Sequence, residues 1–162
     1  MSRLFDPRPP GITTDPGLPL PADIPFLTHL GLTLHTCAEG QAEVRLNLAP
    51  ELLNSFAVAH GGVVMTLLDV AMALAARSHD LSGPGVVTVE LKSSFLRPGE
   101  GAQLTSRGRV LHRSATLAFC EASLLSPEGQ LCAHATGTFK YVRALPGRDR
   151  RINAFQRTPS TP

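Results

Sequence analysis

Asp69 is the only charged residue between Gly61 and Ala76, in a segment that otherwise has the composition of a buried helix. Burying a carboxylate in such a helix costs several kcal/mol unless the group is paired or hydrogen-bonded. An ionised carboxylate beside a substrate can act as a nucleophile or as a general base on water. A structural acid that is paired with a cation or a hydroxyl is the alternative interpretation. Asp69 is therefore the first candidate for a catalytic group.

The same helix is expected to begin at His60-Gly61-Gly62. Glycines let a ligand approach the backbone closely, and amides at a helix start are unpaired and lie at the positive end of the helix dipole. Such a terminus can donate hydrogen bonds to a carbonyl or an oxyanion. Asp69 follows Gly62 by seven residues, which returns it to within about 20° of the same helix face. Alternatively, the two glycines only allow a tight turn into the helix.

The elements that must position these groups can be located from their periodicity. Leu32, Leu34 and, after Glu39-Gly40, the run 42–48 alternate apolar and polar residues, which predicts a hairpin. A helix is expected from about residue 61 to 78, apolar around most of its circumference and hence buried. Four further strands are expected at 86–96, 103–111, 116–125 and 130–142. This order predicts an α+β fold in which one antiparallel sheet curls around the helix, leaving one helix face for a second subunit.

Composition predicts one globular domain with two biased ends. The chain has 162 residues, of which 43% are apolar and 17% are charged. Residues 1–25 hold seven prolines and should form an extended arm, whereas residues 143–162 carry five arginines and one aspartate and should form a flexible basic tail. The domain itself is expected at 26–142. A basic tail without a basic face and interleaved aromatics does not indicate a nucleic-acid partner.

The remaining reactive residues exclude several kinds of site. The three cysteines are odd in number and without metal-ligand spacing, so we expect free thiols in a reducing compartment. The six histidines are scattered, which argues against zinc. Ser55 and Ser114 lack the glycines of a nucleophile elbow. Without a signal sequence or a long apolar span, a cytoplasmic protein that does not contact membranes is the expectation.

Several motifs together resemble the PaaI-like family of hotdog-fold acyl-CoA thioesterases. They are Asn54 six residues before His60, the His60-Gly61-Gly62 start, Leu67-Leu68-Asp69, and the runs 108–113 (GRVLHR) and 133–139 (AHATGTF). The resemblance covers about residues 26 to 142. It implies a hotdog fold, an acyl-CoA substrate, no cofactor or metal, and a homodimer that pairs again into a homotetramer with active sites at the dimer interface.

The resemblance also implies roles for individual residues. Asp69 resembles the acid that attacks the thioester or activates water, and the sequence does not separate these two roles. The Gly61 amide and the Asn54 side chain resemble the pair that polarises the thioester carbonyl from the opposite subunit. Thr88 occupies a hydroxyl position that helps to place the nucleophilic water, although serine is often found there. His60 resembles a residue that orients the loop.

Basic residues are expected where the phosphates of coenzyme A would lie. Arg113 and Arg97 resemble strand-end positions at which family members contact the nucleotide. Ser114 follows Arg113 where glycine before a cation is more usual, so one expected cation is missing. Alternatively, both arginines are solvated surface residues.

Two other functions stay open from the sequence. A hotdog hydratase or dehydratase acting on acyl thioesters would need a histidine paired with an acid in a different loop and helix context, and no such pairing is found. A non-enzymatic acyl-CoA sensor or binding module would make Asp69 structural. Hydrolysis of an acyl-CoA that is lost on changing Asp69 separates the thioesterase from both.

Overall fold

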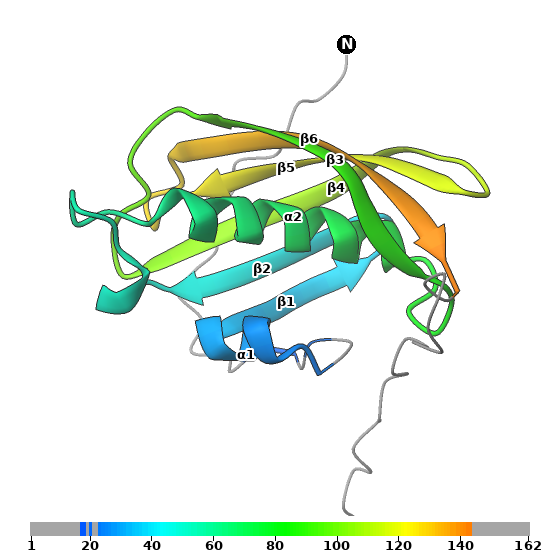
Figure 1. Cartoon of the computed structure of the whole chain (residues 1–162), viewed down its shortest axis with the longest axis horizontal. Coiled ribbons are helices and arrows are strands. Elements are labelled where there is room, and N and C mark those ends of the chain that lie inside the picture. Colours follow the sequence, from blue (N-terminus) through cyan, green and yellow to red (C-terminus); the bar gives the residue numbers. More distant parts are fainter. Residues whose placement is uncertain (1–16, 19, 21–22, 144–162) are drawn as a thin grey trace, which may run out of the picture.

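One antiparallel sheet curls around one long helix in the computed structural model, which describes residues 17–18, 20 and 23–143 (Figure 1). The strand order in the sheet is β1-β2-β4-β5-β6-β3. The predicted α+β arrangement is confirmed. Most of the proline-rich arm and of the basic tail lies outside the described residues. The elements are α1 (Pro25–Leu30), β1 (Leu32–Ala38), β2 (Gln41–Asn47), the 3-10 turn η1 (Pro50–Leu52), α2 (Gly61–Arg77), β3 (Gly85–Phe95), β4 (Gln103–Arg113), β5 (Leu117–Leu125) and β6 (Leu131–Val142).

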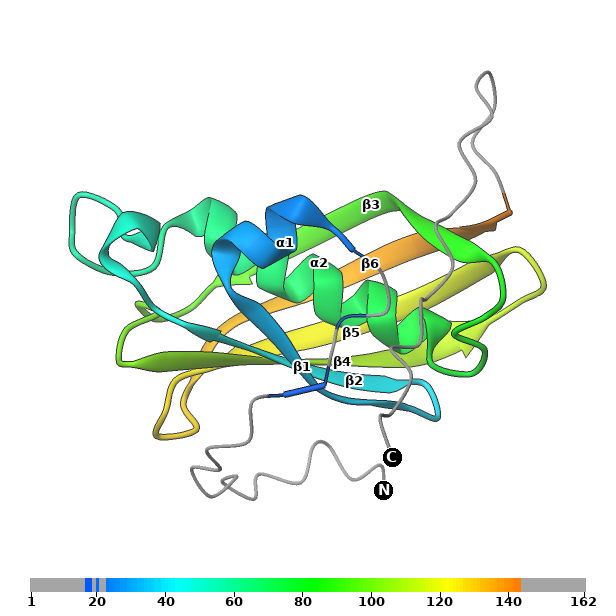
Figure 2. The same ribbon diagram turned by 90° about the horizontal axis from the view of Figure 1, so that it is seen from below.

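Helix α2 lies in the concave side of the sheet, as Figure 2 shows from below. Its leucines and alanines favour helix, and its buried side forms the centre of the core. The helix approaches β4 most closely at Gly108, where an added Cβ would lie 2.3 Å from the carbonyl oxygen of Ala71. Only glycine fits there. This contact fixes the height of α2 above the sheet.

One face of α2 is not covered by its own sheet, as the sequence predicted. Met65 is 44% exposed on this side, whereas Leu67 and Ala71, which face the sheet, are 1% and 0% exposed. Gly62 is exposed and Asp69 half-buried on the uncovered side. Although nearly all residues of α2 are apolar, one of its faces is therefore exposed.

Strand β3 forms an edge of the sheet next to that uncovered helix face. Its other neighbour is β6, so one row of its backbone groups has no strand to pair with among the described residues. Val89 and Phe95 on this strand are more than half exposed, and so is Leu96 just after it. An apolar edge of this kind is a surface on which another strand can pair.

No helix among the described residues is long and apolar enough to cross a membrane.

Candidate active site

The Asp69 carboxylate is held by a hydroxyl from the neighbouring strand. Thr88 on β3 donates a hydrogen bond from Oγ1 to Asp69 Oδ1 at 2.7 Å. Burial raises the pKa of Asp69 above its ordinary value, and the hydrogen bond from Thr88 partly offsets this rise. The structure thus brings together two of the predicted catalytic residues, which are 19 positions apart in the sequence. A carboxylate with a raised pKa is a better base than an ordinary aspartate.

A β-bulge in β3 allows Thr88 to face Asp69 while the inward residues later in the strand still face α2. The register with β6 shifts between Thr88 and Glu90, so that Thr88 pairs with Phe139 and Leu91 pairs with Gly137. Strict alternation from Thr88 would turn Glu90 toward the helix. The bulge instead lets Thr88 face Asp69 while Leu91 and the inward residues after it still face α2.

The start of α2 is capped by His60. Its Nδ1 accepts a hydrogen bond from the Gly62 amide at 3.0 Å. The prediction that both glycine amides are unpaired is therefore wrong for Gly62, because the imidazole occupies its donor. The Gly61 amide has no hydrogen-bond partner among the described residues. His60 thus caps the helix, and the Gly61 amide is left as a donor at the positive end of the helix dipole.

Asn54 organises the loop that leads into α2. Its Oδ1 accepts hydrogen bonds from the amides of Phe56 at 2.8 Å and Val58 at 3.4 Å. The loop is tied to the β3–β4 turn by the hydrogen bond from the Ala59 amide to the Gly99 carbonyl at 2.8 Å. Because Oδ1 is occupied by the loop, the side-chain amide nitrogen of Asn54 is the group that can donate to a ligand.

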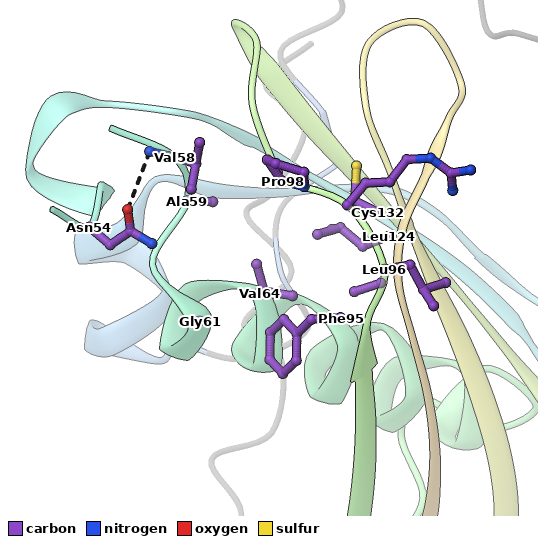
Figure 3. A pocket seen from close by; sticks show the side chains of 13 residues that line it. Asn54, Val58, Ala59, Gly61, Val64, Phe95, Leu96, Pro98, Leu124 and Cys132 are labelled. Atoms are coloured by element: carbon purple, nitrogen blue, oxygen red, sulfur yellow. Dashed lines mark hydrogen bonds between the residues drawn. The ribbon is translucent and has the colours of Figure 1, made fainter. Parts of the chain in front are cut away.

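A cavity of about 340 Å³ lies beside Asn54 and Gly61 (Figure 3). Val64 on α2 and Phe95 at the end of β3 form its sides, and Leu124 on β5 lies across from Asn54. Most of the lining is apolar. The two residues predicted to polarise a carbonyl therefore share the mouth of an apolar cavity, which is the usual form of a small-molecule site.

Two of the predicted substrate contacts, Arg113 and Ser114, are absent from the lining of this cavity within one chain. Arg113 stacks over the Tyr141 ring at 5.3 Å, and the Tyr141 hydroxyl bonds the Ala76 carbonyl near the far end of α2. Ser114 builds the β4–β5 turn, where its Oγ accepts from the Leu117 amide at 3.0 Å. A contact of Arg113 and Ser114 with a nucleotide stays a prediction.

Arg97, in contrast, lines the cavity. Its guanidinium donates a hydrogen bond to the Leu131 carbonyl at 3.0 Å and remains exposed. It is the cation nearest the candidate site among the described cavity-lining residues. A role toward a phosphate likewise stays a prediction.

Sequence reasoning missed Phe95 and Cys132 as cavity residues. A methyl group added at Gly61 would lie 3.8 Å from the Phe95 ring, although 34 positions separate the two residues. Cys132 is 2% exposed and lies on β6 beside Arg97. Neither residue has a spacing signal, because their proximity to the helix start follows from the strand order. The only sequence feature that pointed toward this region was Pro98-Gly99, which marks the end of a strand.

The pH dependence of the reaction should respond to Thr88. Thr88→Val removes the hydrogen bond that lowers the Asp69 pKa, so we expect the acid limb of a kcat/KM profile to move to higher pH. Thr88→Ser retains the hydroxyl and should keep the wild-type limb. Profiles of the three proteins provide the measurement. An unchanged limb in Thr88→Val would mean that Thr88 does not influence the catalytic carboxylate.

Comparison with known proteins places this chain in a recognised family. The family model of the thioesterase superfamily matches residues 56–133. SSO1253 of Saccharolobus solfataricus is 31% identical over 114 residues, covering 70% of this chain and 75% of its own. The medium/long-chain acyl-CoA thioesterase YigI of Salmonella typhimurium is 27% identical over 131 residues, covering 72% of this chain and 84% of its own. The PaaI protein of E. coli superimposes with a TM-score of 0.68 at 24% identity, covering 82% of this chain and 88% of its own.

The sheet wrapped around one main helix is thus a hotdog fold. The chain belongs to the thioesterase superfamily, and it is a thioester hydrolase. The predicted family and fold are confirmed.

Proposed function

We propose that the protein hydrolyses an acyl-CoA thioester to the free acid and coenzyme A. Asp69 is the nucleophile or the general base on water, and the Gly61 amide with the Asn54 side-chain amide polarises the thioester carbonyl. One observation carries most of this proposal: a half-buried carboxylate with a raised pKa lies on the same uncovered helix face whose start presents a free amide to an apolar cavity. The relative named as an acyl-CoA thioesterase supports the choice of coenzyme A esters.

The hydrogen-bond donors and Asp69 have different roles in the proposed hydrolysis. Attack on the thioester carbon moves charge onto the carbonyl oxygen, and each well-placed donor stabilises that charge by roughly 3 kcal/mol. As a general base, Asp69 would take a proton from water while the water oxygen bonds to the carbonyl carbon. As a nucleophile, it would form an anhydride that water then opens. In both routes the C–S bond breaks and the departing thiolate is protonated.

Gly61 and Asp69 of one chain are too far apart to act on the same thioester, so the proposed site requires two chains. Gly61 and Asp69 are eight residues apart on one helix, which separates them by about 12 Å along its axis. A single carbonyl oxygen and its carbon cannot meet both groups at once. We therefore place Asp69 of one subunit opposite Gly61 of the partner subunit, across two antiparallel copies of α2.

The uncovered surfaces of the chain fit such a homodimer. Met65 lies on α2 between Gly61 and Asp69 and is 44% exposed. Val89 is 60% exposed on the edge strand β3, where pairing with a second β3 would continue the sheet. A dimer formed this way would cover both. Assembly of dimers into a homotetramer is proposed from the family resemblance alone.

Mixing two inactive variants should restore activity. Gly61→Val places a side chain at the cavity mouth, and displacing the carbonyl by about 1 Å can cost roughly a hundredfold in rate. The chain itself tolerates the change, since an added Cβ meets only the half-exposed Phe95 ring at 3.8 Å. When Gly61→Val is co-expressed with Asp69→Asn, each mixed dimer contains one intact site. Random pairing then gives about one quarter of the wild-type rate.

Separate purification of the two variants provides the control. Their homodimers, assayed alone and combined without subunit exchange, should stay near background. If co-expression restores nothing although mixed dimers are isolated through two different tags, Asp69 and Gly61 do not act across the interface.

A further inference from the structure

The cavity beside α2 has a polar end and an apolar end. Figure 3 shows Asn54 and Gly61 on one side and Leu124, Leu96 and Cys132 on the other. A ligand that matches this distribution has one acceptor group joined to a hydrocarbon.

The apolar end is closed by the sheet. Leu124 is fully buried and Cys132 is 2% exposed, so both are held by the core behind them. Burial raises the pKa of the Cys132 thiol, which therefore stays neutral and behaves as a small apolar group. Side chains of this kind form a fixed wall rather than a flexible one.

We propose that this cavity receives the hydrocarbon chain of the acyl group, and that Cys132 and Leu124 set the length of chain it accepts. The proposal rests on the function proposed above, because a carbonyl bound by Gly61 and Asn54 directs the chain attached to it into the cavity. The substrate class is then a straight-chain acyl-CoA of medium length.

The volume of the cavity selects the length. A methylene group occupies about the volume of one water in the liquid, roughly 30 Å³, so a cavity of about 340 Å³ holds at most about eleven such groups. Because the mouth is shared with the carbonyl, we expect the best chain to have about six to ten carbons.

A linear chain also fits this cavity better than an aromatic ring does. A cavity of about 150 Å³ suffices for benzene, so a phenyl group would leave about half of the present 340 Å³ unfilled. The unfilled part of the wall would lose its dispersion contacts with the ligand.

The test measures kcat/KM by thiol release for saturated acyl-CoA esters from two to sixteen carbons and for phenylacetyl-CoA. Each methylene buried in the transition state should raise kcat/KM by at most about fourfold, up to about eight carbons, and phenylacetyl-CoA should lie well below that maximum. Cys132→Leu adds about two carbon-sized groups at the closed end and should shift the maximum about two carbons shorter.

Two further variants separate this effect from damage to the fold. Cys37→Leu makes the same substitution at a half-buried cysteine outside the cavity lining and should keep the wild-type profile. Phe95→Ala removes a 54% exposed ring from the cavity wall, which the core can tolerate, and should shift the maximum to longer chains.

The proposal is overturned if folded Cys132→Leu and Phe95→Ala both keep the wild-type maximum, or if they lower the rates on all chain lengths equally. In either case turnover of acyl-CoA by the wild type would leave the proposed hydrolysis standing. Absence of turnover on every ester by the wild type would instead remove the proposed function, and this proposal with it.

Discussion

Asp69→Asn is expected to lower kcat/KM for acyl-CoA hydrolysis by roughly a thousandfold, the scale of losing a general base. Asparagine keeps an oxygen that can accept the Thr88 hydrogen bond of 2.7 Å, so the geometry of the helix and of β3 should persist. The amide can neither attack the carbonyl nor take a proton from water. Thiol release from octanoyl-CoA by the two purified proteins measures the difference.

The same variant should be at least as stable as the wild type at neutral pH. The pKa of Asp69 is raised in the fold, so the wild type loses stability as pH rises through the window between the ordinary value of 3.8 and the folded value. Asparagine has no such loss, and the melting temperatures should converge at a pH below that window.

Asp80→Asn, just after the helix, is the matched control and should retain full activity. A fully active Asp69→Asn would remove Asp69 from the mechanism.

Gly108→Ala is expected to have the largest effect on stability, at least about 3 kcal/mol of the free energy of unfolding. The added Cβ would lie 2.3 Å from the carbonyl oxygen and 2.4 Å from the carbonyl carbon of Ala71. Both are backbone atoms of α2, so no rotamer change relieves the overlap and the helix must move off the sheet. Urea denaturation of wild type and variant provides the measurement.

Ser106→Ala on the same strand is the matched control. Ser106 faces α2 as Gly108 does and is fully buried, and its Oγ has no hydrogen-bond partner in the part of the chain that the structure describes. Removing an unpaired buried hydroxyl should leave stability unchanged or raise it slightly. Equal stability of Gly108→Ala and wild type would mean that α2 does not depend on this contact.

The fold was largely predictable because its elements differ in period. Alternation at Leu32 and Leu34 indicated a strand, and the continuous apolar run after Gly61 indicated a buried helix. The strand order was not readable, because nothing in the local pattern indicates that β4 lies beside β2 or that β3 lies at the edge. The bulge after Thr88 was equally hidden, since a one-residue shift in register leaves no compositional mark.

The candidate site was predictable in part for a related reason. Asp69 was evident as a lone charge in an apolar helix, and Thr88 and Asn54 came from the family resemblance. The Gly62 amide was assigned wrongly because the donor is occupied by the His60 ring, a contact within three residues that depends on a side-chain rotamer. The cavity wall was not predictable, because Phe95 and Cys132 reach Gly61 only through tertiary structure.

Thiol release by the wild-type protein tests the central claim most directly. The purified chain is mixed with an excess of octanoyl-CoA, and free coenzyme A and free octanoic acid are both quantified over time. The proposed function predicts equal amounts of the two products and many turnovers per subunit. Octanoyl-CoA that binds to the folded protein but remains intact, together with a panel of shorter and longer esters that also remain intact, would contradict it and indicate a binding module.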